Sequence, residues 1–261
     1  MGSLCSSRMP IKLTLILVCK IHYYNWEGFE TPPKNIMFAF FETLFADVEI
    51  WEITRLSLTV SGISTFASIL IGLPLGTLLA LKRFPGRSII LTIINTGMAL
   101  PPVVVGLAVA MTLWRSGPLG SFNLIYTPTA IVIAQTIIAA PVVTGLTASA
   151  LQQLDPRLGQ QLLGLGASSW QMVITLWWQV RLSLFAAVMA GFGSVISEVG
   201  ASMMVGGNIS GQTRVLTTAI VLESNKGQFT KAIVLGGFLL FITMLINYAL
   251  TWVQQRGVAH K

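Results

Sequence analysis

Cysteine and histidine are nearly missing from this sequence of 261 residues. Both cysteines, Cys5 and Cys19, lie within the first twenty residues, so the rest of the chain can build no disulfide framework or thiol chemistry. The two histidines, His22 and His260, stand near opposite ends. The patterns HExxH, GxSxG and paired CxxC are also missing. We therefore expect no metal site and no catalytic activity in this chain.

Charge is scarce as well. Only 10% of the residues are charged and 54% are hydrophobic, with a mean hydropathy of +0.76, which is far from soluble-domain composition. The sequence therefore predicts a membrane protein. The net charge of +7 could favour nucleic acid, but no basic cluster is interleaved with aromatic residues. The lysines and arginines stand at the ends of apolar runs, where they flank membrane segments, so we expect membrane lipids and no nucleic acid as partners.

Residues 1–36 differ from the rest of the chain. They contain four basic residues, a short apolar run from Leu13 to Cys19 and the polar stretch YYNWEGFETPPKN. The run is too short to span a bilayer, which needs about 20 residues. We expect either a disordered leader or a mis-assigned start, with Met37 as the working start, and a transmembrane domain over 37–261.

Five long apolar segments predict an all-α protein that crosses the membrane about five times. A segment before them, MFAFFETLFADVEIWE, is apolar on one face and predicts an N-terminal interfacial helix. The five predicted spans are Leu56–Leu81, Ile89–Trp114, Ile125–Leu151, Leu182–Val205 and Ile233–Val253.

The loops carry a modest charge asymmetry. The loop KRFPGR, the 152–181 loop and the C-terminal tail are basic and would share one side of the membrane. The positive-inside rule assigns that side to the cytoplasm. Within the spans, Pro101 and Pro102 predict a kink, and the GxxxG pair Gly72 and Gly76 predicts close helix packing or a moving gate.

The 152–181 loop predicts two short helices joined at a glycine turn. Asp155 and Pro156 form an N-cap and an N1 proline, and Gly164 and Gly166 end that helix. Ser168 and Gln171 have capping-box spacing and would start a second helix, with Trp170, Val173 and Trp177 along one stripe. The residues alone leave two interpretations open: an interfacial connector, or an elbow that docks a soluble partner.

The run QQLLGLGASSWQMVITLWW resembles the cytoplasmic loop of permeases of ABC importers, in which the pattern E-A-A, three residues, G precedes I-x-L-P at a fixed distance. Gly166 matches the glycine and Leu176 falls at the isoleucine, whereas Gln160, Gln161 and Leu162 replace E-A-A. Residues 197–223, SEVGASMMVGGNISGQTRVLTTAIVLE, resemble the tungstate importers within the molybdate and sulfate group. The resemblance implies a type I ABC importer permease fold. It also implies an ATPase-coupling loop that contains Gln160, Gln161, Leu162, Leu163, Gly164, Gly166, Ala167, Ser168 and Trp170.

Because the chain lacks a GxxxxGK[ST] loop, ATP and Mg²⁺ would bind elsewhere. The resemblance implies a cytoplasmic ABC ATPase dimer and an extracytoplasmic oxyanion-binding protein as partners. Because five spans are few to enclose a pathway, we expect two copies of this chain around a two-fold axis, working by alternating access in a bacterial or archaeal plasma (inner) membrane. The chain itself would carry no cofactor.

Glu198 lies inside a predicted span, where a carboxylate costs roughly 2.5–3.5 kcal/mol and should find a partner. We expect a structural or gating hydrogen bond rather than substrate contact, with Gly200 beside it. Asn95, Gln135 and Thr136 are further pathway candidates. In the predicted outer segment 206–231, Thr213 is expected to cap a short helix, and Arg214 is the candidate contact for the binding protein.

Three alternatives stay open at this point. A secondary transporter or channel would need no ATPase, but it predicts paired intramembrane charges or an inverted repeat, and neither is visible. A membrane scaffold would transport nothing. An importer of the same type could instead carry molybdate or sulfate, which are also tetrahedral dianions.

Overall fold

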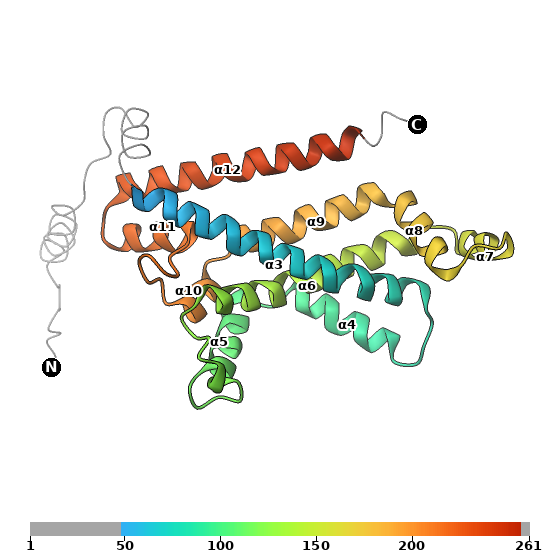
Figure 1. The fold of residues 1–261 in the computed structure, drawn as a ribbon, viewed down its shortest axis with the longest axis horizontal. Coiled ribbons are helices and arrows are strands. Elements are labelled where there is room, and N and C mark those ends of the chain that lie inside the picture. The colour runs from blue at the N-terminus through green and yellow to red at the C-terminus, as the bar shows by residue number, and fades with distance from the viewer. Residues whose placement is uncertain (1–47, 257–261) are drawn as a thin grey trace, which may run out of the picture.

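The structure, a computed structural model, describes residues 48–256, which form α-helices with one short 3-10 turn and no strand. The helices follow one another through short connectors (Figure 1). In order they are α3 (Val48–Leu81), α4 (Arg87–Met98), α5 (Pro102–Leu113), η1 (Gly120–Phe122), α6 (Pro128–Gln152), α7 (Pro156–Gly164), α8 (Ser169–Gln179), α9 (Arg181–Ile196), α10 (Gly200–Gly206), α11 (Leu216–Asn225) and α12 (Phe229–Arg256).

The centre of the molecule is the packing of α3 against α6. A Cβ atom added at Gly72 would lie 2.8 Å from the Cβ of Val143, and one added at Gly76 would lie 2.7 Å from the Cβ of Thr147. Since real Cβ atoms do not approach that closely, any larger residue would push the helices apart. The close-packing interpretation of the GxxxG pair is confirmed.

Three of the described helices, α3, α6 and α12, are long and apolar enough to cross a membrane, and two bent pairs raise the number to as many as five. The prediction of an all-α protein with about five spans is therefore confirmed. Two of the predicted spans, however, are not single continuous helices.

The predicted span Ile89–Trp114 is wrong as a continuous helix, because α4 and α5 meet at an angle of 103°. Pro102 is the first residue of α5, and the residue before a proline is sterically disfavoured in the helical region. Pro101 accordingly has φ −61° and ψ 122°, an extended conformation. The proline pair thus produces a sharp turn, where the sequence predicted a kink.

The predicted span Leu182–Val205 is also interrupted. Helix α9 ends at Ile196 and α10 starts at Gly200. The Glu198 carboxylate accepts a hydrogen bond from the backbone N–H of Ala201 at 2.8 Å, and so satisfies a donor of the new helix start. This polar residue therefore stabilises the helix break locally.

The predicted N-terminal interfacial helix falls only partly within the described residues. Residues 48–52 are the first turns of α3, continuous with the first span, and not a separate helix. The predicted leader, residues 1–36, and the rest of the interfacial segment lie outside the described residues.

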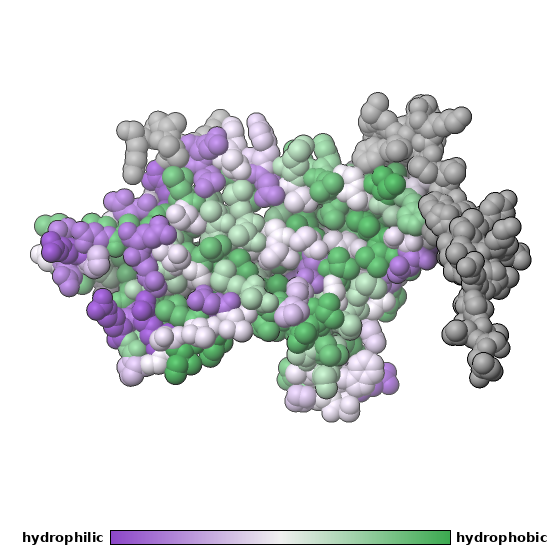
Figure 2. Space-filling model, turned by 180° about the vertical axis from the view of Figure 1, so that it is seen from behind, coloured by the Kyte–Doolittle hydropathy of each residue, from purple (hydrophilic) through white to green (hydrophobic). Residues whose placement is uncertain are grey.

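The two ends of the bundle differ in composition. The 82–86 connector, α7, α8 and the end of α12 lie at one end, which we call the basic end; α11 and the starts of α3 and α12 lie at the other, which we call the opposite end (Figure 1). Hydrophilic residues gather at the basic end and hydrophobic ones cover the middle (Figure 2). The two basic loops that the charge pattern grouped on one side thus lie together with the end of α12, and residues 257–261 of the tail lie outside the described residues.

Candidate coupling elbow and pathway residues

The elbow, which we define as α7, α8 and the turn between them, begins where the sequence predicts. The Asp155 side chain accepts a hydrogen bond from the backbone N–H of Arg157 at 2.9 Å, and Pro156 occupies the first helical position. A proline there loses nothing, because the first N–H groups of a helix have no partner within it. The predicted start of this helix is confirmed.

The end of α7 is a Schellman turn. The N–H of Ala167 donates to the carbonyl of Leu162 at 3.1 Å, and the N–H of Gly166 donates to the carbonyl of Leu163 at 3.0 Å. Gly166 has φ +89°, in the left-handed region that glycine adopts without strain. The backbone conformation at this position therefore favours glycine.

Helix α8 starts with the predicted capping box. The Ser168 hydroxyl accepts from the N–H of Gln171 at 3.3 Å, and the Gln171 side chain accepts from the N–H of Ser168 at 2.8 Å. Two donors that the helix start would leave without partners are satisfied reciprocally. Because the capping residues are local, the turn between α7 and α8 is determined largely by its own sequence.

One face of the elbow is fixed to the bundle and the other is exposed. Leu158, Leu162 and Met172 pack against a buried cluster at the ends of α6 and α8. On the outer face, Leu163 is 47% exposed, Leu165 85% and Trp170 66%. Gln160, Gln161, Gly164 and Ser168 are exposed beside them. The elbow thus presents apolar side chains within a polar rim, an arrangement typical of protein-docking surfaces.

A chain of contacts leads from the exposed face into the bundle. The Trp170 and Trp177 rings meet edge to face with centroids 6.5 Å apart. The Trp177 indole N–H donates to the Thr77 hydroxyl of α3 at 2.9 Å. Sequence reasoning missed Thr77, because its partner is 100 residues away. The elbow is thereby joined to the longest helix of the described bundle.

Gln135, on α6, is a buried junction between helices. Its side-chain oxygen accepts from the Ser64 hydroxyl of α3 at 3.1 Å. Its amide donates to the Val195 carbonyl of α9 at 3.4 Å and to the Ser202 hydroxyl of α10 at 3.3 Å. With 2% of its surface exposed, Gln135 holds helices together in this conformation and is not open to a solute.

The other two pathway candidates lie in different surroundings. Asn95 is exposed on α4, a helix with no buried residue. Thr136 is half-buried, and its hydroxyl donates to the Val132 carbonyl of its own helix at 2.7 Å. No hydrogen bond between described residues joins Asn95, Gln135 and Thr136 into one cluster.

Glu198 and Gly200 lie at the break between α9 and α10. Glu198 is 7% exposed, and its backbone carbonyl accepts from the Thr217 hydroxyl of α11 at 2.9 Å. A side chain at Gly200 would collide with Val103 of α5. The hydrogen bond between helices therefore involves the backbone of Glu198, while its carboxylate bonds within the break.

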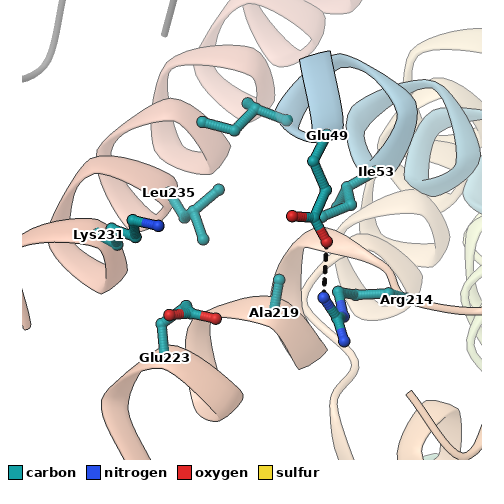
Figure 3. Close-up of a pocket in the computed structure, with 8 residues that line it drawn as sticks. Glu49, Ile53, Arg214, Ala219, Glu223, Lys231 and Leu235 are labelled. Carbon is teal, nitrogen blue, oxygen red and sulfur yellow. Dashed lines mark hydrogen bonds and ion pairs between the residues drawn. The ribbon is translucent and has the colours of Figure 1, made fainter. Parts of the chain in front are cut away.

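Arg214 is paired within the chain. Its Nη1 lies 2.7 Å from Oε1 of Glu49 on α3, and the Ser210 hydroxyl donates to the same oxygen at 3.0 Å. Figure 3 shows Glu49 and Arg214 facing each other beside a cavity of about 40 Å³ that Glu223 and Lys231 also line. The Arg214 side chain is only 16% exposed. Sequence reasoning missed Glu49 as a partner because the two residues are 165 positions apart.

The predicted role of Thr213 as a helix cap is wrong. Its hydroxyl donates to the Gly206 carbonyl at 2.5 Å and accepts from the N–H of Ile209 at 3.0 Å, so it closes the preceding loop. The start of α11 is instead satisfied from α3, because the N–H of Leu216 donates to the Ser57 hydroxyl at 2.8 Å. The helix itself lies where it was expected.

Comparison with known proteins decides the family. Residues 72–257, well over half of the chain, match the model of a family described as binding-protein-dependent transport system inner membrane component. The chain belongs to this family. Both the elbow and the break between α9 and α10 lie inside the matched region.

Two relatives of this family of permeases cover most of the chain. A probable anion ABC transporter permease protein of Haloferax volcanii is 39% identical over 201 residues, which are 75% of this chain and 87% of the relative. The tungstate uptake system permease protein TupB of Peptoclostridium acidaminophilum is 37% identical over 209 residues, which are 80% of this chain and 92% of the relative. Both relatives are named as permease proteins of transport systems.

The fold matches solved permeases too. The crystal structure of a bacterial ABC transporter that imports the acidic polysaccharide alginate aligns with a TM-score of 0.69 at 20% identity, over 94% of this chain and 95% of that one. The predicted fold of a type I importer permease is therefore confirmed. Among the described residues, no group of three or more His, Cys, Asp and Glu side chains could hold a metal ion.

Proposed function

We propose that this permease is the transmembrane subunit of an ATP-driven importer that moves a tetrahedral oxyanion, tungstate in the first place, by alternating access. The cargo is favoured by the two relatives, one named for anions and one for tungstate. The sequence resemblance of residues 197–223 to the tungstate group points the same way. Molybdate and sulfate are the competing cargoes, because all three are tetrahedral dianions.

The observation that carries the coupling part of the proposal is the exposed face of the elbow. Leu163, Leu165 and Trp170 are exposed at the basic end, and a soluble partner could cover them. A groove in a separate cytoplasmic ABC ATPase dimer would bury these side chains, at about 25 cal/mol per Å² of apolar surface. ATP and Mg²⁺ bind in that ATPase, and this chain holds no cofactor.

Movement of the elbow would be transmitted to the membrane helices α3 and α6 through two contacts. The packed face of the elbow contacts the end of α6, and Trp177 contacts Thr77 of α3. Closure of the ATPase dimer would therefore displace α3 and α6, the pair at the centre of the bundle. Because packed helices resist bending, a rigid-body rotation is the expected response.

The pathway requires a second copy of this chain. Helix α4 buries none of its residues within the chain, and it carries Asn95 together with several exposed isoleucines. Two copies related by a two-fold axis would cover such surfaces and enclose a route between them. The breaks between α4 and α5 and between α9 and α10 would form the gate. Glu198 and Gly200 are the proposed gating residues, and both lie at the second break.

The opposite end would receive the oxyanion from an extracytoplasmic binding protein. The chain would lie in the plasma membrane of a bacterium or archaeon, with the elbow in the cytoplasm. Arg214 is the proposed contact of this face with the binding protein. Its ion pair with Glu49 lies beside an open groove formed by the start of α3 and residues 211–214.

The cargo is tested by elemental analysis of cells that lack their own tungstate and molybdate uptake. These cells express the chain with its ATPase and binding protein and receive equal trace amounts of both oxyanions. We expect tungsten to accumulate in preference to molybdenum. Accumulation of molybdenum without tungsten would contradict the tungstate assignment, and an otherwise identical strain without this chain is the control.

A further inference from the structure

A second groove lies at the junction of α8 and α9 and contains none of the proposed pathway residues. Its volume is about 320 Å³, at the lower end of the range of ligand pockets. The two helices meet at 76°, and one continuous face of both lines the hollow. The lining side chains include Trp177, Trp178, Arg181, Leu184, Phe185 and Val188.

The groove arises because the bend at Val180 separates two faces. Leu176 and Val180 turn toward the end of α6 and are buried there. Trp178 turns away and remains 63% exposed. The bend therefore leaves a hollow beside Trp178 that the side chains of Leu176 and Val180 do not line.

Among the described residues that line the groove, Arg181 carries the one charge and the other side chains are apolar. The Arg181 guanidinium carbon lies 5.4 Å from the centroid of the Trp178 ring, so the charge sits over an aromatic face at the rim. The remaining lining side chains on α9 are Leu, Phe and Val. Tryptophan and arginine together are typical of the boundary between lipid headgroups and hydrocarbon.

Charge complementarity decides between the two occupants that an apolar groove in a membrane protein could have. A second copy of this chain around the proposed two-fold axis would present the same basic end, with Lys82, Arg83 and Arg157, on the same side of the membrane as Arg181. A phospholipid of the same leaflet brings a phosphate of opposite sign together with an apolar chain. Basic pockets on the cytoplasmic side of membrane helices bind anionic headgroups for this reason.

We propose that the α8–α9 groove binds an anionic phospholipid, with one acyl chain along Leu184, Phe185 and Val188 and the headgroup phosphate at Arg181. The bound chain fills the concave side of the bend and holds α8 at its angle to α9. Trp177, which lines the groove, also joins α8 to α3 through Thr77. The lipid site goes beyond the proposed transport activity and does not depend on its cargo.

The test compares phosphatidylglycerol with phosphatidylcholine of the same acyl chains, added to the purified full chain in detergent, with bound lipid counted by native mass spectrometry. We expect phosphatidylglycerol to bind more tightly to the unmodified chain. Arg181→Gln should weaken its binding about fivefold, the scale of one basic residue near an anionic headgroup. Arg157→Gln, a change to an exposed arginine of the same end, should leave it unchanged.

A second variant tests the groove itself without altering charge. Val188→Phe fills the hollow and should reduce phosphatidylglycerol binding, whereas Leu240→Phe, on the exposed face of α12, should not. Equal binding of the two lipids, or undiminished selectivity in Val188→Phe, would overturn the proposal. A change from dimer to monomer in Val188→Phe with lipid selectivity intact would also overturn it and assign the groove to a second copy.

Discussion

The two ends of this molecule are built in different ways. At the basic end the elbow is shaped by local hydrogen bonds, because Asp155, Ser168 and Gln171 cap helices two or three residues away and Gly166 makes the turn. At the opposite end the connector before α11 is held by distant partners on α3. The elbow projects with an apolar face exposed, whereas the connector is folded back onto the bundle.

This difference fits the two tasks that the ends would perform. A lever that passes force from a soluble partner must keep its shape while it protrudes, so the hydrogen bonds that form its turn and helix ends must be internal. A connector whose conformation follows movements of the bundle needs contacts with other helices, here with α3. Such contacts can break and reform together when the helices move. Substitutions at the two ends should therefore fail in different ways.

The largest effect is expected at Gly166. Valine in the left-handed conformation costs about 1–2 kcal/mol or more, because its Cβ crowds the following carbonyl. No atom lies within 4 Å of the position that a Cβ would occupy, so the strain comes from the backbone alone. We expect Gly166→Val to reduce ATPase recovered with the affinity-purified permease about tenfold.

Gly164→Ala is the matched control for this change. Gly164 is in the last turn of α7, and an added Cβ there also meets nothing within 4 Å. The Gly164→Ala variant should recover as much ATPase as the unmodified chain does. Full ATPase recovery with Gly166→Val would contradict the docking role of the turn.

A smaller effect is expected where the elbow meets α3. Trp177→Phe keeps an aromatic ring and removes the indole N–H that donates to Thr77, which costs about 0.5–1.5 kcal/mol. ATPase binding should be retained while ATP-dependent uptake falls about two- to tenfold. Thr77→Val should have the same effect, and the double variant should add little to either. Additive losses would contradict a shared hydrogen bond as the link.

The smallest effect is expected at the opposite end. Glu49→Gln removes the charge that pairs with Arg214, and since the Glu49 side chain is 46% exposed the loss is about 0.2–1 kcal/mol. Trypsin cleavage after Arg214 in the purified chain should become up to about fivefold faster. Glu52→Gln changes an exposed carboxylate nearby and should leave the rate unchanged. Equal rates in all three proteins would contradict the ion pair as the contact that holds the connector.

The local features were predictable from the sequence and the long-range ones were not. The caps at Asp155 and Ser168 and the turn at Gly166 have partners within a few positions, so their spacing alone predicts them. The pairing of Arg214 with Glu49 and that of Trp177 with Thr77 join residues 165 and 100 positions apart. A single sequence carries no signal for such pairs.

The broken spans were missed for a different reason. Hydropathy averaged over about 20 residues detects the apolar stretch but not a break inside it. The pair Pro101 and Pro102 predicts a kink, but two successive prolines favour an extended residue between the helices, and the bend there reaches 103°. The cost of a carboxylate within a span predicts that Glu198 has a hydrogen-bond partner. The identity of that partner, the N–H of Ala201 at the start of α10, depends on the backbone conformation at the break.

The most direct test of the central claim is tungstate uptake into proteoliposomes that contain the permease with its ATPase, supplied with the binding protein outside and with ATP or a non-hydrolysable analogue inside. We predict accumulation against a gradient with ATP and none with the analogue or without the ATPase. Uptake by the permease alone, driven by an ion gradient or running downhill, would contradict ATP-driven import and favour a secondary transporter or channel.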